Sequence, residues 1–89
     1  MSYETLEQVL LEEIAVEEFD LVIYNDDVNT FQFVIETLME VCGHDHLQAE
    51  QCTLLIHYKG KCAVKKGTAQ ELKPVCLEIL RRGISAKVE

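Results

Sequence analysis

The chain has 89 residues, 16 acidic and eight basic side chains, and a formal net charge of −8 at pH 7. A chain of this length forms one small domain, and an acidic sequence without tryptophan or a basic cluster argues against nucleic acid as a partner, because phosphate contacts require Lys and Arg. No apolar run has the length of a membrane span and no signal-peptide pattern is found, so we expect no membrane partner.

The acidic charge is concentrated at the N-terminus. Residues 1–20 hold seven acidic side chains and no basic one, whereas residues 21–89 hold nine acidic and eight basic side chains. Because so many like charges oppose a compact state, we predict a flexible acidic extension over residues 1–17 and a folded domain over residues 18–89. The first element of that domain is the apolar run Phe19 to Tyr24, whose β-forming residues predict a strand.

A capping pattern follows this first strand. Asn29, with Gln32 three residues later, predicts the start of a helix that runs to about Cys42, and Gly43 is expected to end it. The helical spacing of the apolar residues predicts which side chains this helix buries: Val34, Leu38 and Val41.

A second capping pattern, Asp45 with Gln48, predicts the next helix, which ends before the turn Lys59-Gly60-Lys61. His44 and His46 flank this cap, and we expect both to be exposed rather than to bind a metal, because no set of four ligands surrounds them. The side chains expected to pack inward from this helix are Ala49, Cys52, Leu55 and Ile56.

The remaining chain predicts a strand, a helix and a final strand. Lys61 to Lys66 form the strand, Thr68 opens the helix and Gly83 closes it, and Pro74 is expected to delay the helix or to kink it. Three short strands cannot cover one another, so the order β-α-α-β-α-β predicts an α+β fold with three helices on one face of a small sheet. The final strand is predicted because apolar residues alternate with polar ones at Ile84, Ala86 and Val88.

The four cysteines stand in otherwise apolar stretches and never form a C-x-x-C pair. This favours buried, reduced thiols in a cytoplasmic protein over disulfides or a zinc site. Cys52 and His57 lie five residues apart on one helix, which does not place them on the same face, and no oxyanion-binding device accompanies them. We therefore expect no enzymatic activity, no metal and no other cofactor.

A cluster of hydrogen-bond acceptors is predicted at the corner after the first strand. Asn25 and Asp26 follow that strand directly, and His57 stands near the end of the second helix. An amide, a carboxylate and an imidazole together suit an ammonium group, which needs several acceptors at once. Taken singly, Asn25 and Asp26 fit a turn with Asx hydrogen bonds, and His57 fits a helix-end histidine.

Two segments carry a resemblance to a known family. Asn25-Asp26-Asp27 precedes a capped helix containing Phe33-Val34, and His57-Tyr58-Lys59-Gly60-Lys61 follows at the expected separation. With these segments the chain resembles, over roughly residues 18–88, the ClpS family of bacterial adaptors, which deliver substrates to Clp-type AAA+ protease chaperones. The resemblance implies three antiparallel strands with three helices. It also implies binding of N-end rule substrates, whose N-terminal residue is Leu, Phe, Tyr or Trp.

The resemblance implies that Asn25, Asp26 and His57 hold the free α-amino group of this N-degron, with Asp27 as a supporting residue. Where Met, Thr-Pro and a second Met are common in the family, this chain has Phe31, Asn29-Thr30 and Thr53, and we expect these departures to reshape the pocket. The positions expected to line the pocket for the substrate side chain are Ile23, Asn29, Phe31, Val34, Thr53, Ile56 and Ile84.

The partner that the resemblance implies is the N-terminal domain of a ClpA- or ClpC-like AAA+ chaperone. The docking region is occupied here by Gln70, Glu71, Lys73, Pro74 and Val75, to which the particular acidic and basic pair of well-known relatives cannot be transferred. The alternative is an interaction domain resembling the C-terminal domain of the ribosomal stalk protein, which shares this topology and binds translation factors. That domain would need an exposed basic docking helix. A further alternative is the amino-acid-binding domain of a larger N-end rule ubiquitin ligase, over which the small size of the chain favours a free adaptor.

Overall fold

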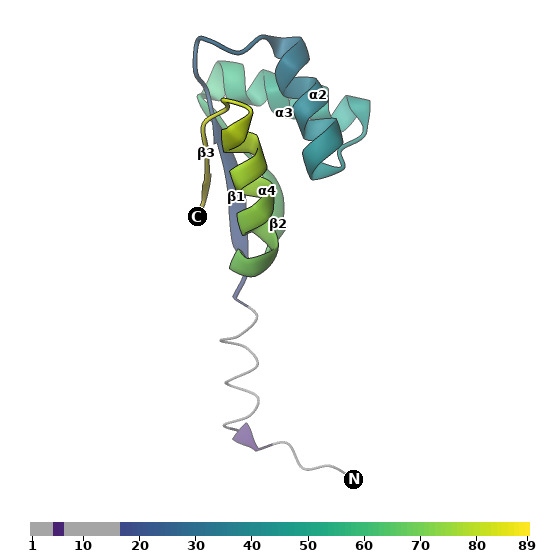
Figure 1. Ribbon diagram of the computed structural model, residues 1–89. Helices are drawn as coiled ribbons and strands as arrows, with labels where there is room; N and C mark the ends of the chain where they lie inside the picture. The colour runs from purple at the N-terminus through teal and green to yellow at the C-terminus, as the bar shows by residue number, and fades with distance from the viewer. Residues whose placement is uncertain (1–4, 7–16) are drawn as a thin grey trace.

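The computed structural model describes residues 5–6 and 17–89. The predicted order β-α-α-β-α-β is confirmed there, whereas the extension predicted over residues 1–17 lies outside the described residues except for positions 5, 6 and 17. The elements in chain order are β1 (Phe19–Tyr24), α2 (Phe31–Cys42), α3 (His46–Lys59), β2 (Lys61–Gly67), α4 (Ala69–Arg81) and β3 (Ala86–Val88) (Figure 1).

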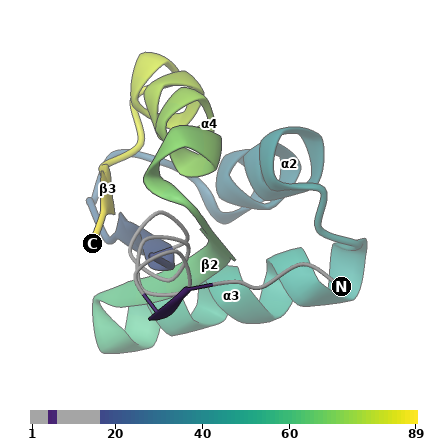
Figure 2. The same cartoon turned by 90° about the horizontal axis from the view of Figure 1, so that it is seen from below.

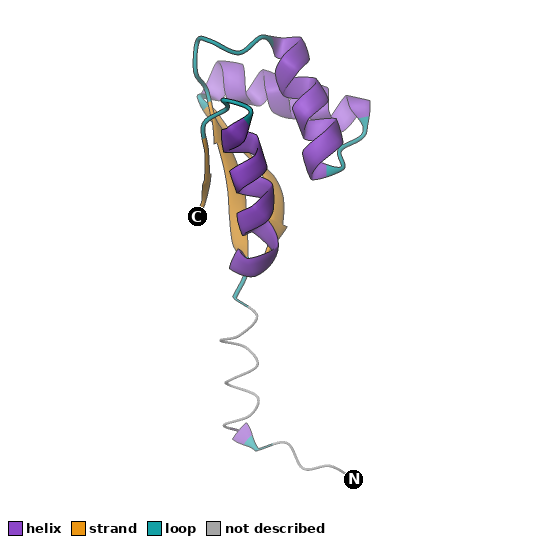
Figure 3. Cartoon of the chain, viewed as in Figure 1, coloured by secondary structure: helices purple, strands orange, loops and turns teal. Residues whose placement is uncertain are grey.

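The sheet is antiparallel with the strand order β2-β1-β3, so β1 is its central strand (Figure 3). Ile23 of β1 pairs with Cys62 of β2 on one side and with Ala86 of β3 on the other. Leu21 and Ile23 are fully buried. Because side chains alternate along a strand, these two residues point to the same face, which becomes the inner face of the sheet.

The three helices pack against this inner face. One core cluster joins Leu21 and Ile23 with residues of every helix, and Figure 2, which looks roughly along β1, shows α4, α2 and α3 following one another around the strands. The predicted α+β fold is therefore confirmed. No helix among the described residues is both long and apolar enough to cross a membrane. The helical members of the cluster are Val34, Ile35, Leu38, Cys42, Ala49, Ile56, Leu72, Cys76 and Ile79.

Burial along α3 differs from the predicted pattern. Leu55, expected to pack inward, is 46% exposed, whereas Thr53 is 3% exposed. The Thr53 hydroxyl donates to the carbonyl oxygen of Ala49 at 2.7 Å, so its burial leaves no polar group without a partner. Since α3 carries apolar residues on more than one side, its apolar pattern alone did not identify the buried face at position 55.

The N-cap of α2 is Thr30, and the prediction that Asn29 caps this helix is wrong. The Thr30 hydroxyl accepts a hydrogen bond from the backbone N–H of Phe33 at 3.1 Å. Gln32 donates to Glu36 at 3.0 Å rather than reaching back to the cap. The side chain of Asn29 is therefore available for contacts outside the helix.

The other helix starts follow the sequence. Asp45 caps α3 by accepting from the backbone N–H of Gln48 at 2.7 Å. Thr68 caps α4, and Glu71 reaches back to the backbone N–H of Thr68 in a reciprocal capping box. Gly60 ends α3 in the left-handed conformation, with φ of 90°, where residues with a side chain are strained.

Two predictions near the C-terminus need correction. α4 begins at Ala69, ahead of Pro74, and continues through it, so the proline does not delay the helix. The final strand begins at Ala86, two residues later than predicted. Ile84 therefore lies in the loop between α4 and β3, yet it is 2% exposed and belongs to the core.

His44 is buried, so the prediction of an exposed histidine is wrong at this position, while His46 is exposed. The Nε2 atom of His44 lies 2.6 Å from the carbonyl oxygen of Val64 in β2. Because a carbonyl oxygen only accepts, Nε2 must carry the hydrogen and donate it. This contact joins the turn between α2 and α3 to the sheet.

Replacing Thr30 by alanine should lower the free energy of unfolding by about 1 kcal/mol, because the backbone N–H of Phe33 loses its acceptor at the start of α2. Urea unfolding followed by circular dichroism measures this change. Gln32→Ala, which removes only an exposed contact to Glu36, serves as the control and should stay within about 0.5 kcal/mol of the parent. Equal stabilities of the Thr30→Ala variant and the parent would contradict the assignment of this cap.

Candidate functional site

A pocket opens at the carboxyl end of β1, where three segments meet. The backbone N–H of Asn25 donates to the carbonyl oxygen of Gly60 at 2.8 Å, and that of Tyr24 donates to Ser85 at 3.0 Å. The first bond brings the end of α3 to this corner, and the second brings the loop between α4 and β3. With α2 starting just beyond the corner, these segments enclose a cavity of about 230 Å³.

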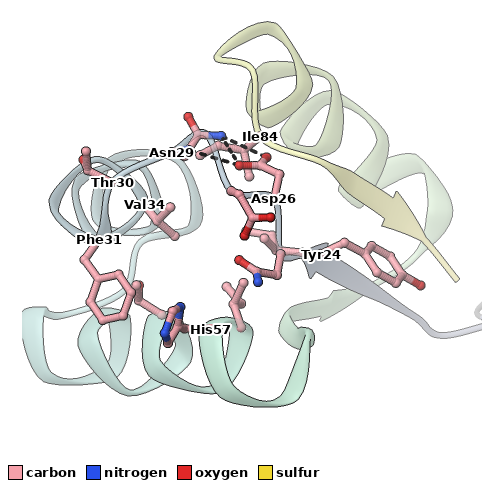
Figure 4. A pocket seen from close by; sticks show the side chains of 13 residues that line it. Tyr24, Asp26, Asn29, Thr30, Phe31, Val34, His57 and Ile84 are labelled. Atoms are coloured by element: carbon pink, nitrogen blue, oxygen red, sulfur yellow. Dashed lines mark hydrogen bonds between the residues drawn. The ribbon is translucent and has the colours of Figure 1, made fainter.

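Every residue predicted for the site lines this cavity (Figure 4). The lining comes from β1 and the corner after it, from α2, from α3 and from the loop between α4 and β3. Two lining residues were not predicted: Tyr24, the last residue of β1, and Thr30, the cap of α2. Their adjacency to Asn25 and to Asn29 in the sequence is the signal that could have identified them. The predicted residues at the cavity are Ile23, Asn25, Asp26, Asp27, Asn29, Phe31, Val34, Thr53, Ile56, His57 and Ile84.

The base of the pocket is apolar. Ile23 comes from β1, Val34 from α2, Ile56 from α3 and Ile84 from the loop after α4, and each is at most 8% exposed. These buried side chains also belong to the hydrophobic core, so the base of the pocket is part of the core packing. Phe31 lies in the first turn of α2 and is 42% exposed, so part of its ring remains open to a ligand. The cavity therefore suits a small apolar group.

Asp26 is the most heavily hydrogen-bonded polar residue of the site. Its Oδ1 accepts from the backbone N–H of Val28 at 3.2 Å and of Asn29 at 3.1 Å. The side-chain amide of Asn29 lies 2.9 Å from each carboxylate oxygen. Partial burial acts to raise the pKa of Asp26, but the hydrogen bonds from Asn29, Val28 and the backbone of Ser85 outweigh it and lower the pKa below its ordinary value. The carboxylate is therefore ionised at neutral pH.

Asn25 and Asp27 flank Asp26 and are both exposed. Within the described residues, neither side chain has a hydrogen-bond partner. The amide oxygen of Asn25 and the carboxylate of Asp27 can therefore accept hydrogen bonds from a ligand without breaking an existing contact.

His57 lies in the last turn of α3 and reaches the pocket beside Phe31 (Figure 4). The two rings meet edge to face, with centroids 5.0 Å apart and an interplanar angle of 72°. Tyr58 stands 4.9 Å from His57 on its other side, also edge to face. Such ring contacts restrict the imidazole, and in its neutral form one ring nitrogen is an acceptor.

The arrangement combines an apolar cavity with an amide, two carboxylates and an imidazole at its polar side. These groups are all acceptors or can act as acceptors, so they favour a ligand with an apolar part and a cationic donor. Within residues 5–6 and 17–89, no three His, Cys, Asp or Glu side chains are placed to hold a metal ion.

The cysteines lie away from the pocket lining and are all free, as predicted, although Cys52 and Cys62 are only partly buried. Burial raises the pKa of Cys42 to about 11. Burial, together with the neighbouring Cys62, raises the pKa of Cys52 to about 12. These two thiols stay protonated at neutral pH and are therefore poor nucleophiles.

The fold and sequence match known proteins. A family model described as "ATP-dependent Clp protease adaptor protein ClpS" matches residues 15–87. The ATP-dependent Clp protease adapter protein ClpS of Campylobacter jejuni (strain 81-176) is 40% identical over 57 residues, covering 64% of this chain and 57% of that protein. The protein of the same name from Pectobacterium carotovorum (strain PC1) is 36% identical over 59 residues, covering 64% and 56%. The chain thus spans little more than half the length of these curated relatives.

A solved structure shows the same fold. It is that of Agrobacterium tumefaciens ClpS2 bound to L-phenylalaninamide, with a TM-score of 0.70, 16% sequence identity, and coverage of 82% of this chain and 95% of that chain. The likeness thus extends over most of both proteins.

Proposed function

This chain belongs to the ClpS family, and we propose that it is an adaptor that binds the free N-terminus of proteins beginning with Leu, Phe, Tyr or Trp and delivers them to a Clp AAA+ chaperone for degradation. The observation that carries this proposal is the pocket at the end of β1, in which an apolar base lies below a group of hydrogen-bond acceptors. A bulky first side chain together with its α-ammonium group has this combination of properties.

In the proposed complex, Asn25, Asp26 and His57 hold the α-ammonium group, and Asp27 supports them. An ammonium has three N–H donors and no acceptor, so it needs acceptors from several directions. Asn25 and Asp27 have no competing partner among the described residues, whereas the carboxylate of Asp26 already accepts bonds from Val28 and Asn29. Asp26 therefore contributes chiefly a fixed negative charge, close to acceptors that are still free.

The side chain of the first substrate residue would enter the apolar base of the pocket. Burying a Leu or Phe side chain favours binding by about 1.5–3 kcal/mol. The cavity of about 230 Å³ is smaller than typical pockets for drug-sized ligands, which start near ~300 Å³. It therefore suits a single residue, and the rest of the substrate would remain outside. The bound L-phenylalaninamide of the Agrobacterium protein, an amino acid derivative with a free amino group, supports this ligand class.

An adaptor needs no catalytic group of its own, in keeping with the protonated thiols of Cys42 and Cys52. The proposed partner is the N-terminal domain of a ClpA- or ClpC-like chaperone, and we propose the cytoplasm as the place where both act. The alternative, a domain like that of the ribosomal stalk, would need an exposed basic docking helix. Two basic residues close α4, but Arg81 pairs with Glu78, and Arg82 pairs with both Glu78 and Glu40. This pairing argues against the alternative.

Short peptides beginning with Phe, Leu, Tyr or Trp should bind in isothermal calorimetry, and N-acetylated copies of the same peptides should bind much more weakly. Acetylation removes the positive charge and two N–H donors, and the loss of each polar partner costs about 1–3 kcal/mol. His57→Ala should weaken the free peptides and leave the acetylated ones little changed. Equal affinities for free and acetylated peptides would exclude the proposed ammonium site.

Phe31→Ala should admit peptides beginning with Ile or Val and weaken those beginning with Phe or Leu. A rigid ring at this wall hinders side chains branched at Cβ, and its removal also takes away apolar contact. Shape changes of this size in a hydrophobic pocket discriminate by about 1–3 kcal/mol. Competition measured by fluorescence anisotropy gives the preference profile.

The matched control for this variant is Leu55→Ala, which removes a side chain of similar exposure from α3 outside the pocket lining. It should leave the preference profile unchanged. An unchanged profile in a folded Phe31→Ala variant would remove Phe31 from the site.

A further inference from the structure

One side chain at the pocket contacts both the corner after β1 and the loop between α4 and β3. The Nδ2 atom of Asn29 lies 2.9 Å from both carboxylate oxygens of Asp26 and 3.0 Å from the carbonyl oxygen of Gly83. All three neighbours are acceptors, so the amide nitrogen, and not its oxygen, must face them. The two amide hydrogens can thus serve Gly83 and the Asp26 carboxylate at the same time, and Figure 4 marks the bonds to Asp26.

The link to Gly83 fixes the neighbouring residue of the pocket. Gly83 has a φ of 87° and is followed directly by Ile84, which lines the cavity and is 2% exposed. Asn29 itself comes immediately before Thr30, the cap of α2. The side chain of Asn29 therefore adds a second link that holds the Ile84 loop near the start of α2, beside the backbone bond from Tyr24 to Ser85.

We propose that Asn29 is a positioning residue that clamps the loop carrying Ile84 to the Asp26 corner and thereby sets the width of the pocket. The proposal rests on the proposed function for the class of ligand, an N-terminal hydrophobic residue. It assigns Asn29 a role different from that of a wall of the side-chain pocket, because its amide hydrogens are both used within the protein.

The turn after β1 does not itself need the Asn29 side chain. The Oδ1 atom of Asp26 also accepts from the backbone N–H groups of Val28 and Asn29, which is an Asx-type turn held by the main chain. Removing the amide should therefore leave this main-chain turn in place, while the side-chain bonds to Asp26 and the connection to Gly83 are lost. Threonine offers one hydroxyl hydrogen and could not donate to both Asp26 and Gly83, and aspartate would have no donor when ionised.

The same amide also influences the ionisation of Asp26. Partial burial raises the pKa of this carboxyl, but the backbone and side-chain hydrogen bonds of Asn29, among others, bring it below the ordinary value. Loss of the Asn29 amide should therefore move the pKa of Asp26 upward. Tyr24, Asp27 and His57 are the other titratable side chains that line this pocket, and they remain the same in the variants.

The test compares Asn29→Ala and Asn29→Asp with Gln32→Ala, a control that removes an amide of α2 bonded only to Glu36. NMR titration of the Asp26 carboxyl carbon measures its pKa without any ligand, and anisotropy measures affinity for peptides beginning with Leu and with Trp. Asn29→Ala should raise the Asp26 pKa and weaken the Leu peptide by at least about fivefold, the equivalent of one hydrogen bond. The Trp peptide should lose less, because a wider pocket favours the larger side chain.

Asn29→Asp should also weaken the Leu peptide, because its ionised carboxylate has no hydrogen to donate and repels the Asp26 carboxylate and the carbonyl oxygen of Gly83 that the amide contacts in the parent. Gln32→Ala should match the parent in both measurements. An unmoved Asp26 titration with unchanged peptide affinities would overturn the clamp, as would parent-like affinity in Asn29→Asp. Uniform weakening of both peptides, in proportion to lost thermal stability, would show a merely structural role. If the parent protein binds neither peptide, the proposed function is wrong. The titration of Asp26 without ligand still tests whether the Asn29 side chain holds the Asp26 carboxylate.

Discussion

The backbone hydrogen bonds at the end of β1 are the constraint on which the rest of the site depends. The N–H of Tyr24 bonds to Ser85, and the N–H of the next residue, Asn25, bonds to Gly60. The end of the central strand is thus tied on one side to the loop before β3 and on the other to the end of α3. His57 precedes Gly60 by three residues and Ile84 directly precedes Ser85, so both arrive at the corner that bears Asn25.

Most of the fold could be predicted because local signals agree with the global arrangement. Each of these signals acts within a few residues, and the structure has the predicted element at each one. They are the apolar run before Asn25, the N-caps Asp45 and Thr68, and the helix-ending Gly60. Prediction failed at Asn29 because Asn and Thr are both good N-caps. Thr30 serves as the cap, and the amide of Asn29 finds its partners elsewhere in the fold.

The site could be predicted as a set of residues but not as a network. Asn25, Asp26 and His57 were predicted to share one site from their residue types and from the family resemblance. The structure places all three at one cavity. The link from Asn29 to Gly83 joins positions 54 residues apart. No spacing rule encodes such a contact, because it depends on how the α4–β3 loop approaches the corner. The burial of His44 against Val64 was missed for the same reason.

The central claim is that an N-terminal hydrophobic residue enters the cavity at the end of β1. The most direct test is an NMR titration of methyl-labelled protein with L-phenylalaninamide, followed by measurement of nuclear Overhauser effects from the ligand ring. The account predicts contacts from the ring to the methyl groups of Val34, Ile56 and Ile84, with saturable shifts at Asn25 and His57. Contacts instead to Leu77 and Leu80, the exposed apolar residues of α4, or no saturable shift at all, would contradict it.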